Sequence, residues 1–301
     1  MTRVTASPSV RALAGRKGID LEDLGRTLGR RALAREDVEA AVSGSKPGGG
    51  LSSVSGPDHS TFWDVDHSAY GPVRAEPMTR FARTSARNLA AANALIPQVT
   101  HHDEADAGAI EEFRKTLKAE AAENGVRLTA LAFHVKALVH CLKRFETFNA
   151  SLSPDGAMLY LKDYVHIGIA VDTPYGLTVP VVRDADRKGL FELAKDISAL
   201  AAKAAGRKLP PDALGGASMS ISNLGGIGGT AFTPIVNPPE VAILGITRTR
   251  IQPVWDGEAF QPRPVVPLDL SYDHRVINGA EAARFLAEYA TLIGDPRRLL
   301  L

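Results

Sequence analysis

The chain has 301 residues, 45% of them apolar, so its length and composition allow one large domain or one domain with a small module. Its formal net charge of +1 gives no overall attraction toward nucleic acid or an anionic membrane. No apolar run approaches the roughly 20 residues of a membrane-spanning helix, and the start lacks the apolar core of a signal peptide. Cys141 is the single cysteine, which excludes an internal disulfide and fits a reducing compartment. Its apolar surroundings favour a small buried side chain over a nucleophile.

Residues 43–60, SGSKPGGGLSSVSGPDHS, are rich in Gly, Ser and Pro and have almost nothing to bury. Such a composition predicts a flexible linker. It separates a segment of residues 1–42 from a much larger segment of residues 61–301.

The segment 1–42 has the pattern of a small helical module. Ser7 as N-cap and Pro8 at the first helical position predict the start of a helix, and Gly18 predicts its end. A second short helix is expected at 34–42. A tiny helical module on a flexible tether is more typical of docking than of chemistry, although a solvated surface of mixed charge is the alternative. The candidate docking residues are Arg11, Arg16, Lys17, Arg26, Arg30 and Arg31.

Residues 61–301 mix helical and strand patterns without regular alternation. This predicts an α+β fold with a large mixed sheet rather than a doubly wound fold. Helices are expected at 107–125, 127–148, 191–206 and 279–293, and strands at 164–173, 176–182, 217–225 and 240–248. Asp256-Gly257 between two strand-like runs predicts a β-hairpin. The glycines of NLGGIGGTAF (223–232) precede no convincing amphipathic helix, which argues against a dinucleotide or phosphate loop.

The stretch LSYDHRVINGAEAARF, residues 270–285, places His274 between a predicted strand and the final helix. A side chain at such a junction is expected to be exposed and rigidly held. Asn278, followed three residues later by Glu281, resembles a capping box at the start of the helix. The residues alone leave two interpretations open, a catalytic histidine or a polar corner that joins two structural elements.

The same stretch resembles the signature of the dihydrolipoamide acyltransferases, the E2 components of 2-oxo acid dehydrogenase complexes. Their pattern, His-x-x-x-Asp-Gly, is also seen in chloramphenicol acetyltransferase. The similarity extends in order and spacing through IPQVTHHDEAD, FNASLSPDG, VHIGIAVDTPYGLTVPVVRDAD, SMSISNLGGIGGTAFTPIVNPPEVAILGI and PVWDGEAFQPRPVVPLDLSYDHRVINGA. Residues 1–42 resemble the peripheral subunit-binding domain of these proteins, so the resemblance covers nearly the whole chain. The C-terminal third is most similar to the acetyl-transferring, pyruvate-type members.

The resemblance implies a chloramphenicol-acetyltransferase-like α+β catalytic domain, with a mixed sheet and flanking helices, after an all-α peripheral subunit-binding domain. It also implies that His274 is the general base and that Ser222 stabilises the oxyanion. Asn278 falls where the family usually has Asp. Because an amide takes up no proton at neutral pH, we expect Asn278 to fix the turn by hydrogen bonds. Arg87 is its expected partner.

The implied substrates are coenzyme A or acetyl-CoA and dihydrolipoamide, with no metal. We find no lipoyl domain in the sequence, so either the sequence is a truncated piece or the lipoyl arm belongs to another chain. The implied assembly is a homotrimer, in which His274 of one subunit faces Ser222 of its neighbour. Such trimers join into a hollow cubic or dodecahedral core, and a core of 24 subunits is expected over one of 60. Pyruvate dehydrogenase, dihydrolipoamide dehydrogenase or both are expected to dock on residues 1–42, in a bacterial cytoplasm or a mitochondrial matrix.

Two other functions are compatible with these residues. The amide of Asn278 favours a non-catalytic scaffold that recruits partner enzymes, whereas the presence of both His274 and Ser222 argues against it. A free-standing acetyltransferase for a small molecule would have no use for the docking module and the linker. The histidines outside the signature are interpreted as structural or solvated, and these are His101, His102, His134, His140 and His166.

Overall fold

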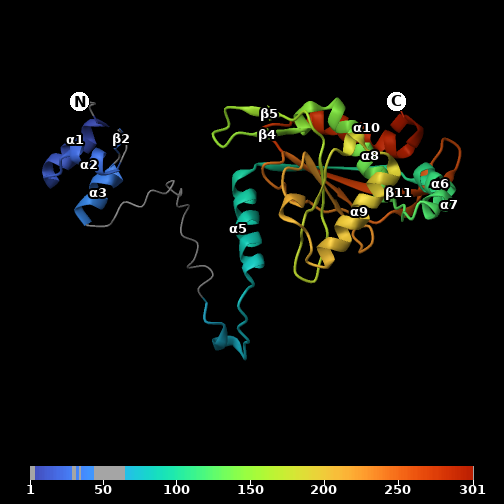
Figure 1. The fold of residues 1–301 in the computed structure, drawn as a ribbon, viewed down its shortest axis with the longest axis horizontal. Helices are drawn as coiled ribbons and strands as arrows, with labels where there is room; N and C mark the ends of the chain where they lie inside the picture. Colours follow the sequence, from blue (N-terminus) through green and yellow to red (C-terminus); the bar gives the residue numbers. More distant parts are fainter. Residues whose placement is uncertain (1–3, 29–31, 34, 44–64, 301) are drawn as a thin grey trace. The chain divides into compact units, whose positions relative to one another are not determined.

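The computed structural model describes residues 4–28, 32–33, 35–43 and 65–300 (Figure 1). The chain divides between Glu76 and Pro77 into two compact units, which are described separately. The linker predicted at 43–60 lies outside the described residues, apart from Ser43 at the end of a helix.

Among its described residues, the smaller unit has three helices around an apolar core that includes Val10, Leu24 and Val38. Its elements are β1 (Thr5–Ala6), α1 (Pro8–Lys17), α2 (Leu21–Leu28), β2 (Ala32–Leu33), α3 (Arg35–Ser43) and the 3-10 turn η1 (His67–Tyr70). The predicted ends of α1 are confirmed, because the Ser7 hydroxyl accepts a hydrogen bond from Val10 N and Gly18 closes the helix at φ 68°. The sequence analysis does not predict α2, whose central Gly25 lowers its helix propensity.

The larger unit is a mixed α+β domain, as predicted. Its helices are α5 (Arg80–Leu95), α6 (Gly108–Thr116), α7 (Lys118–Glu123), α8 (Ala130–Arg144), α9 (Leu190–Ala205) and α10 (Gly279–Gly294), with 3-10 turns η2 (Glu146–Phe148), η3 (Ala185–Arg187), η4 (Pro211–Ala213) and η5 (Pro296–Leu300). Its strands are β3 (Gln98–Asp106), β4 (Ala150–Leu152), β5 (Leu159–Leu161), β6 (Ile167–Ile169), β7 (Val181–Val182), β8 (Met219–Asn223), β9 (Ala242–Ile246), β10 (Arg250–Trp255) and β11 (Phe260–Asp273). In Figure 1, α5 lies at one end of the sheet and α6 and α7 lie at the other.

Seven strands form the main sheet, in the order β10-β11-β9-β8-β6-β7, with β3 paired to β11. Strand β8 runs parallel to β6 and β9, whereas β11 runs antiparallel to β3, β9 and β10. The mixed sheet and the hairpin at Asp256-Gly257 are therefore confirmed. The strands β4 and β5 form a separate two-stranded ribbon.

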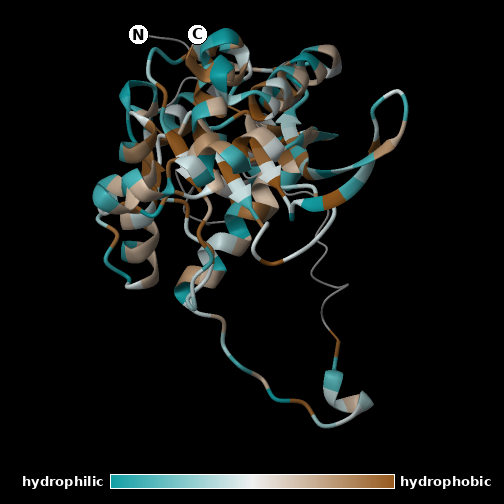
Figure 2. Ribbon diagram, turned by 90° about the vertical axis from the view of Figure 1, so that its right-hand side faces the viewer, coloured by the Kyte–Doolittle hydropathy of each residue, from teal (hydrophilic) through white to brown (hydrophobic). Residues whose placement is uncertain are grey.

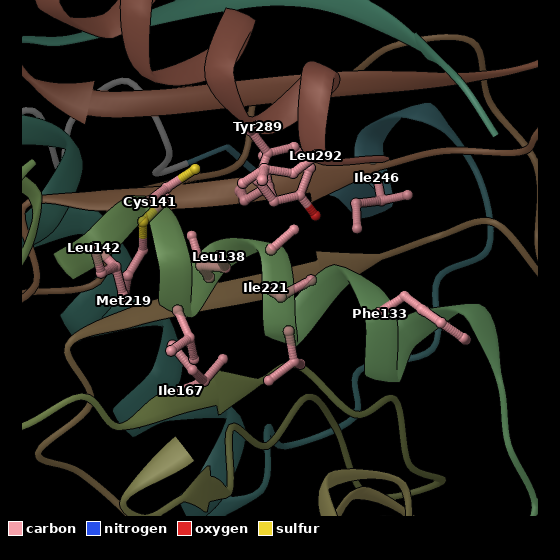
Figure 3. Packing of buried hydrophobic residues seen from close by; sticks show 14 of the residues in the cluster. Phe133, Leu138, Cys141, Leu142, Ile167, Met219, Ile221, Ile246, Tyr289 and Leu292 are labelled. Carbon is pink, nitrogen blue, oxygen red and sulfur yellow. The ribbon is translucent and has the colours of Figure 1, made fainter. Parts of the chain in front are cut away.

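One face of the main sheet packs against the hydrophobic core. The strand register sets Leu270, Leu244 and Ile221 side by side, and all three are fully buried. Figure 3 shows Ile221 in this core with Leu138 of α8 and Tyr289 of α10. Because side chains alternate along a strand, the residues that follow or precede these three point to the opposite face of the sheet.

The sequence analysis does not predict helix α5 or strands β3, β4 and β5 of the larger unit. Helix α5 exposes its large apolar residues Phe81, Leu89 and Leu95, so no buried stripe marks it as a helix. Strand β3, QVTHHDEAD, is mostly polar and contains Asp and Glu, which are depleted in strands. Its conformation follows from pairing with β11 over its whole length, a long-range contact.

The helix predicted at 107–125 is interrupted at Leu117, between α6 and α7, and ends at Gly125 as expected. Helices change from hydrophilic to hydrophobic within single turns (Figure 2), as expected where one side of a helix faces a core. Within the described parts of the chain, no helix is long and apolar enough to cross a membrane.

Candidate active site

His274 stands on a turn that begins where β11 ends. Its side chain is exposed, and its backbone N–H donates to the carbonyl oxygen of Pro97 at 3.1 Å. The preceding residue, Asp273, is buried and organises the turn. Its carboxylate accepts hydrogen bonds from the backbone and guanidinium of Arg275, and its carbonyl accepts from two further backbone N–H groups. The hydrogen bond between the Arg275 side chain and the Asp273 carboxylate also raises the pKa of the Arg275 guanidinium. The turn that presents His274 is therefore rigidly built.

Asn278 is the N-cap of α10, as predicted. Its backbone is extended, at φ −89° and ψ 160°, and its side-chain oxygen accepts a hydrogen bond from Glu281 N at 2.9 Å. The second half of the expected capping box is absent, because the Glu281 carboxylate accepts from the Thr147 hydroxyl instead. Asn278 thus fixes the start of the helix that follows the His274 turn.

Arg87 does not pair with Asn278 within this chain. It lies exposed on α5, and no hydrogen bond joins the two residues in the described structure. The expected contact is not made within a single copy of the chain and stays a prediction for the assembled protein.

Ser222 lies near the end of β8 and is half-buried. It pairs with Gly245 of β9, which in turn pairs with Asp269 of β11. Its neighbour Ile221 points into the core, so the Ser222 hydroxyl points to the other face of the sheet. The glycine-rich segment that follows has no helix, in agreement with the interpretation that it is not a phosphate loop.

His274 and Ser222 lie at opposite ends of the sheet. Asp269 is in register with Ser222 two strands away, and His274 follows Asp269 by five residues. At about 3.3 Å per residue and about 4.8 Å per strand, this places the two residues about 19 Å apart. No hydrogen bond spans such a distance. The two side chains therefore cannot act on one substrate atom within a single copy of the chain.

A third polar group lies in the same row as Ser222 and was missed by the sequence analysis. His102 of β3 is in register with Asp269, and its Nδ1 donates to Asp269 Oδ1 at 2.6 Å. The other carboxylate oxygen of Asp269 accepts from Phe232 N at 3.3 Å. No local pattern in the sequence indicates this group, because it depends on the pairing of β3 with β11.

The remaining histidines and Cys141 agree with the structural interpretation. His134 is buried, with Nδ1 at 2.7 Å from the hydroxyl of Tyr289, and burial lowers the pKa of His134 to about 4. Burial also raises the pKa of the Cys141 thiol, which makes it a poor nucleophile. His166 Nδ1 accepts from Asp184 N at 3.0 Å.

The candidate docking residues divide into three groups. Arg11 donates to the carbonyl oxygens of Val4 and Ala6, so it is engaged within its own unit. Arg16 and Lys17 are exposed in the last turn of α1, and Arg26 is exposed and paired with Asp23. Arg30 and Arg31 lie outside the described residues.

Among the residues that the structure describes, no cluster of three or more His, Cys, Asp or Glu side chains has an arrangement that could hold a metal ion. Ser222, His274 and Asn278 are the candidate catalytic groups, and a hydroxyl, an imidazole and an amide serve proton transfer and hydrogen bonding.

Comparison with known proteins connects these residues to a family. Residues 70–301 match the family described as 2-oxoacid dehydrogenases acyltransferase (catalytic domain). The acetyltransferase component of the pyruvate dehydrogenase complex of Pseudomonas aeruginosa, a dihydrolipoyllysine-residue acetyltransferase, is 48% identical over 99% of this chain and 55% of its own length. The chain spans about half the length of the curated relatives that it matches most strongly.

Two solved structures are close to the larger unit. The cubic core of the pyruvate dehydrogenase multienzyme complex is 53% identical, with a TM-score of 0.78 over 79% of this chain and 98% of that chain. The dihydrolipoamide acetyltransferase of Azotobacter vinelandii is 52% identical, with the same TM-score and coverage. That structure was determined to investigate a serine, a histidine and an asparagine in the catalytic mechanism, and the three have the same spacing along the chain as Ser222, His274 and Asn278.

Proposed function

Because the chain belongs to the 2-oxoacid dehydrogenase acyltransferases, we propose that it transfers an acetyl group between dihydrolipoamide and coenzyme A as the core component of a pyruvate dehydrogenase complex. The spacing of Ser222, His274 and Asn278, shared with the three residues studied in the A. vinelandii enzyme, is the observation that carries this proposal. The relatives with the highest identity act in pyruvate dehydrogenase complexes, which favours acetyl as the acyl group.

In the proposed reaction the imidazole of His274 takes the proton from the thiol of one substrate. An ordinary thiol and an ordinary imidazole differ by about two pKa units, so this transfer costs about 3 kcal/mol and can accompany attack. The thiolate sulfur forms a bond to the thioester carbonyl carbon, and the Ser222 hydroxyl donates a hydrogen bond to the oxyanion. When the intermediate collapses, the original carbon–sulfur bond breaks and protonated His274 returns its proton to the leaving thiolate.

Asn278 acts in this proposal through the turn and not as a base. Its side chain caps α10, four residues after His274, and so helps to fix the direction in which the imidazole points. An amide meets this requirement as well as a carboxylate does, because both accept the hydrogen bond from Glu281 N. The relative with an asparagine at the same spacing removes the reason to favour a non-catalytic scaffold.

The separation of about 19 Å between His274 and Ser222 supports a site shared between copies. In a closed trimer each interface can bring the His274 end of one subunit to the Ser222 end of the next, which gives three equivalent sites. The similarity to a cubic core favours assembly of such trimers into a 24-subunit particle. The smaller unit, with Arg16 and Lys17 exposed, is the proposed docking site for pyruvate dehydrogenase, dihydrolipoamide dehydrogenase or both.

The test of this function is acetyl transfer from acetyl-CoA to free dihydrolipoamide. We expect activity in the wild type, a loss of about 100- to 10,000-fold in kcat for His274→Ala, and a modest change for Asn278→Asp. A wild type without activity that gains it in Asn278→Asp would instead establish a scaffold silenced by the amide. Activity that persists undiminished in His274→Ala would reject the proposed mechanism.

A further inference from the structure

One row of side chains crosses four strands on the face of the sheet that carries Ser222. The register sets His102 of β3 beside Asp269 of β11, Asp269 beside Gly245 of β9, and Gly245 beside Ser222 of β8. Paired residues point to the same face of a sheet, so the side chains of His102, Asp269 and Ser222 lie on one side. Gly245 leaves a vacant position between Asp269 and Ser222.

The ring of Phe232 fills that vacant position. A Cβ at Gly245 would meet the Cε1 and Cζ atoms of Phe232 at 2.7 and 2.8 Å, and the Cβ of Asp269 at 3.0 Å. Because Gly245 pairs with Ser222, the ring occupies the strand position next to that of Ser222, and neighbouring strands lie about 4.8 Å apart. Phe232 belongs to the segment between β8 and β9, which begins directly after Ser222 and Asn223.

Asp269 holds this segment in place. Its side chain is 1% exposed, with one oxygen bonded to His102 Nδ1 at 2.6 Å and the other to Phe232 N at 3.3 Å. A buried carboxylate is stable only when it is paired and hydrogen-bonded, so His102 and the Phe232 backbone are both needed. His102 is itself half-exposed, which makes it accessible to substitution without disturbing the core.

We propose that His102 and Asp269 are positioning residues of the proposed acyl transfer, and that they act by fixing the Phe232 ring as a wall beside the Ser222 hydroxyl. This inference rests on the proposed function of Ser222. Neither residue touches the reacting atoms. The wall restricts where the thioester carbonyl lies relative to the hydroxyl, and an oxyanion donor is effective only within a narrow range of distances.

The adjacent row of the same strands provides a matched comparison. There the Oγ1 of Thr100 and the Oγ of Ser271 are 2.7 Å apart across β3 and β11, as in the His102–Asp269 pair. The position beside Ser271 on β9 is occupied by Ile243 and not by a glycine, so a side chain of the strand itself stands there. A general loss of cross-strand hydrogen bonding would affect both rows equally.

The experiment measures kcat and KM for both substrates, the melting temperature, and amide hydrogen exchange at Phe232 in the full chain. We expect Asp269→Ala to accelerate exchange at Phe232 and to lower kcat about tenfold, with KM for coenzyme A within about twofold of the wild type. His102→Leu should lower kcat about threefold, because Asp269 loses one of its partners. His102→Asn should restore the rate, since its amide nitrogen occupies the place of Nδ1.

Two further variants separate positioning from stability. Gly245→Ala should lower kcat like Asp269→Ala, because the added methyl meets the ring at 2.7 and 2.8 Å and displaces it. The methyl also crowds the Cβ of Asp269 at 3.0 Å, but the hydrogen-bonding groups of His102 and Asp269 are retained. Thr100→Val, which removes the matched hydrogen bond, should leave kcat within about twofold of the wild type.

The outcomes distinguish this inference from the function on which it rests. If the wild type is active and His102→Leu, Gly245→Ala and Thr100→Val all keep the wild-type kcat, the inference alone is overturned. This holds even where Asp269→Ala fails to fold. An equal loss of kcat in Thr100→Val and His102→Leu also overturns it, because the effect would then be one of sheet stability. A wild type without acetyl transfer overturns the proposed function and the inference together.

Discussion

The two ends of the sheet present their candidate catalytic side chains in different ways. His274 stands outside the sheet, on a turn organised by buried Asp273 and closed by the Asn278 cap. Ser222 belongs to a strand, and its surroundings are set by what lies beside it, Gly245 and the ring of Phe232. The imidazole end is therefore built mainly from local hydrogen bonds, with one long-range bond from His274 N to Pro97, and the hydroxyl end from long-range packing. Each end of the sheet is preorganised, but neither end is a complete site.

The largest expected effect comes from combining two defective subunits, which tests whether the ends meet between copies. His274→Ala and Ser222→Ala should each lose at least about 100-fold in kcat. If each site takes one end from each of two subunits in a closed trimer, every mixed trimer has one intact site in three and should recover about a third of the wild-type rate. A 24-subunit core built from randomly mixed trimers should recover about a quarter. The measurement is kcat of mixed assemblies purified through a different tag on each variant.

The control for this experiment is a mixture of the two variants purified separately and combined under conditions where subunits do not exchange. It should show the sum of the parental rates. Co-expressed variants that also give no more than that sum would mean that His274 and Ser222 do not form a site together between neighbouring subunits.

The next effect concerns the core that joins the two ends, where His134 of α8 contacts Tyr289 of α10. Burial lowers the pKa of folded His134 to about 4 from its usual value of 6.5, so protonation favours the unfolded chain. The free energy of unfolding should be highest above pH 6.5 and fall by about 3 kcal/mol from this group as the pH drops to 4. Denaturant unfolding of wild type and His134→Gln over this pH range measures it.

The difference between the free energies of unfolding of the wild type and His134→Gln at each pH isolates the contribution of His134, because all other groups titrate in both proteins. His140→Gln, on the same helix but only half-buried, is the matched control and should keep the pH dependence of the wild type. A wild type and a His134→Gln variant that lose stability in parallel below pH 6.5 would exclude His134 as the cause.

The smallest effect concerns the cap at the imidazole end. Asn278→Ala removes the acceptor for Glu281 N and should cost about 1 kcal/mol of stability, whereas Asn278→Asp keeps the acceptor and should cost less. If the cap orients the His274 turn, Asn278→Ala should also lower kcat more than Asn278→Asp does. Thermal unfolding and acetyl transfer, measured on the same preparations, compare the two quantities. Equal stability of all three proteins would show that the cap contributes nothing measurable.

The parts of the molecule with local signals could be predicted from the sequence. Ser7 and Gly18 bound α1, Asp256-Gly257 closes the hairpin, and Asn278 caps α10, since each acts on its own neighbouring backbone. The elements that depend on distant partners were missed. Strand β3 has a polar sequence that becomes a strand through β11, and α5 exposes its apolar residues in the single chain.

The candidate site follows the same division. His274, Asn278 and Ser222 were identified from motifs, and the family comparison agrees with the expected family. The Arg87–Asn278 contact is not made within one copy, where Arg87 lies exposed on α5 and Asn278 caps α10. The His102–Asp269 pair and the Phe232 wall could not be found from motifs, because residues far apart in sequence form them.

The sequence by itself determined which chemical groups this protein carries and how each is held locally, because caps, turns and strand alternation depend on near neighbours. The tertiary structure alone decided where these groups lie relative to one another. Strand β11 runs antiparallel to β8 and β9, and this direction sends His274 to one end of the sheet while Ser222 stays at the other. The direction and register of strands are set by long-range pairing, which no local pattern in the sequence specifies.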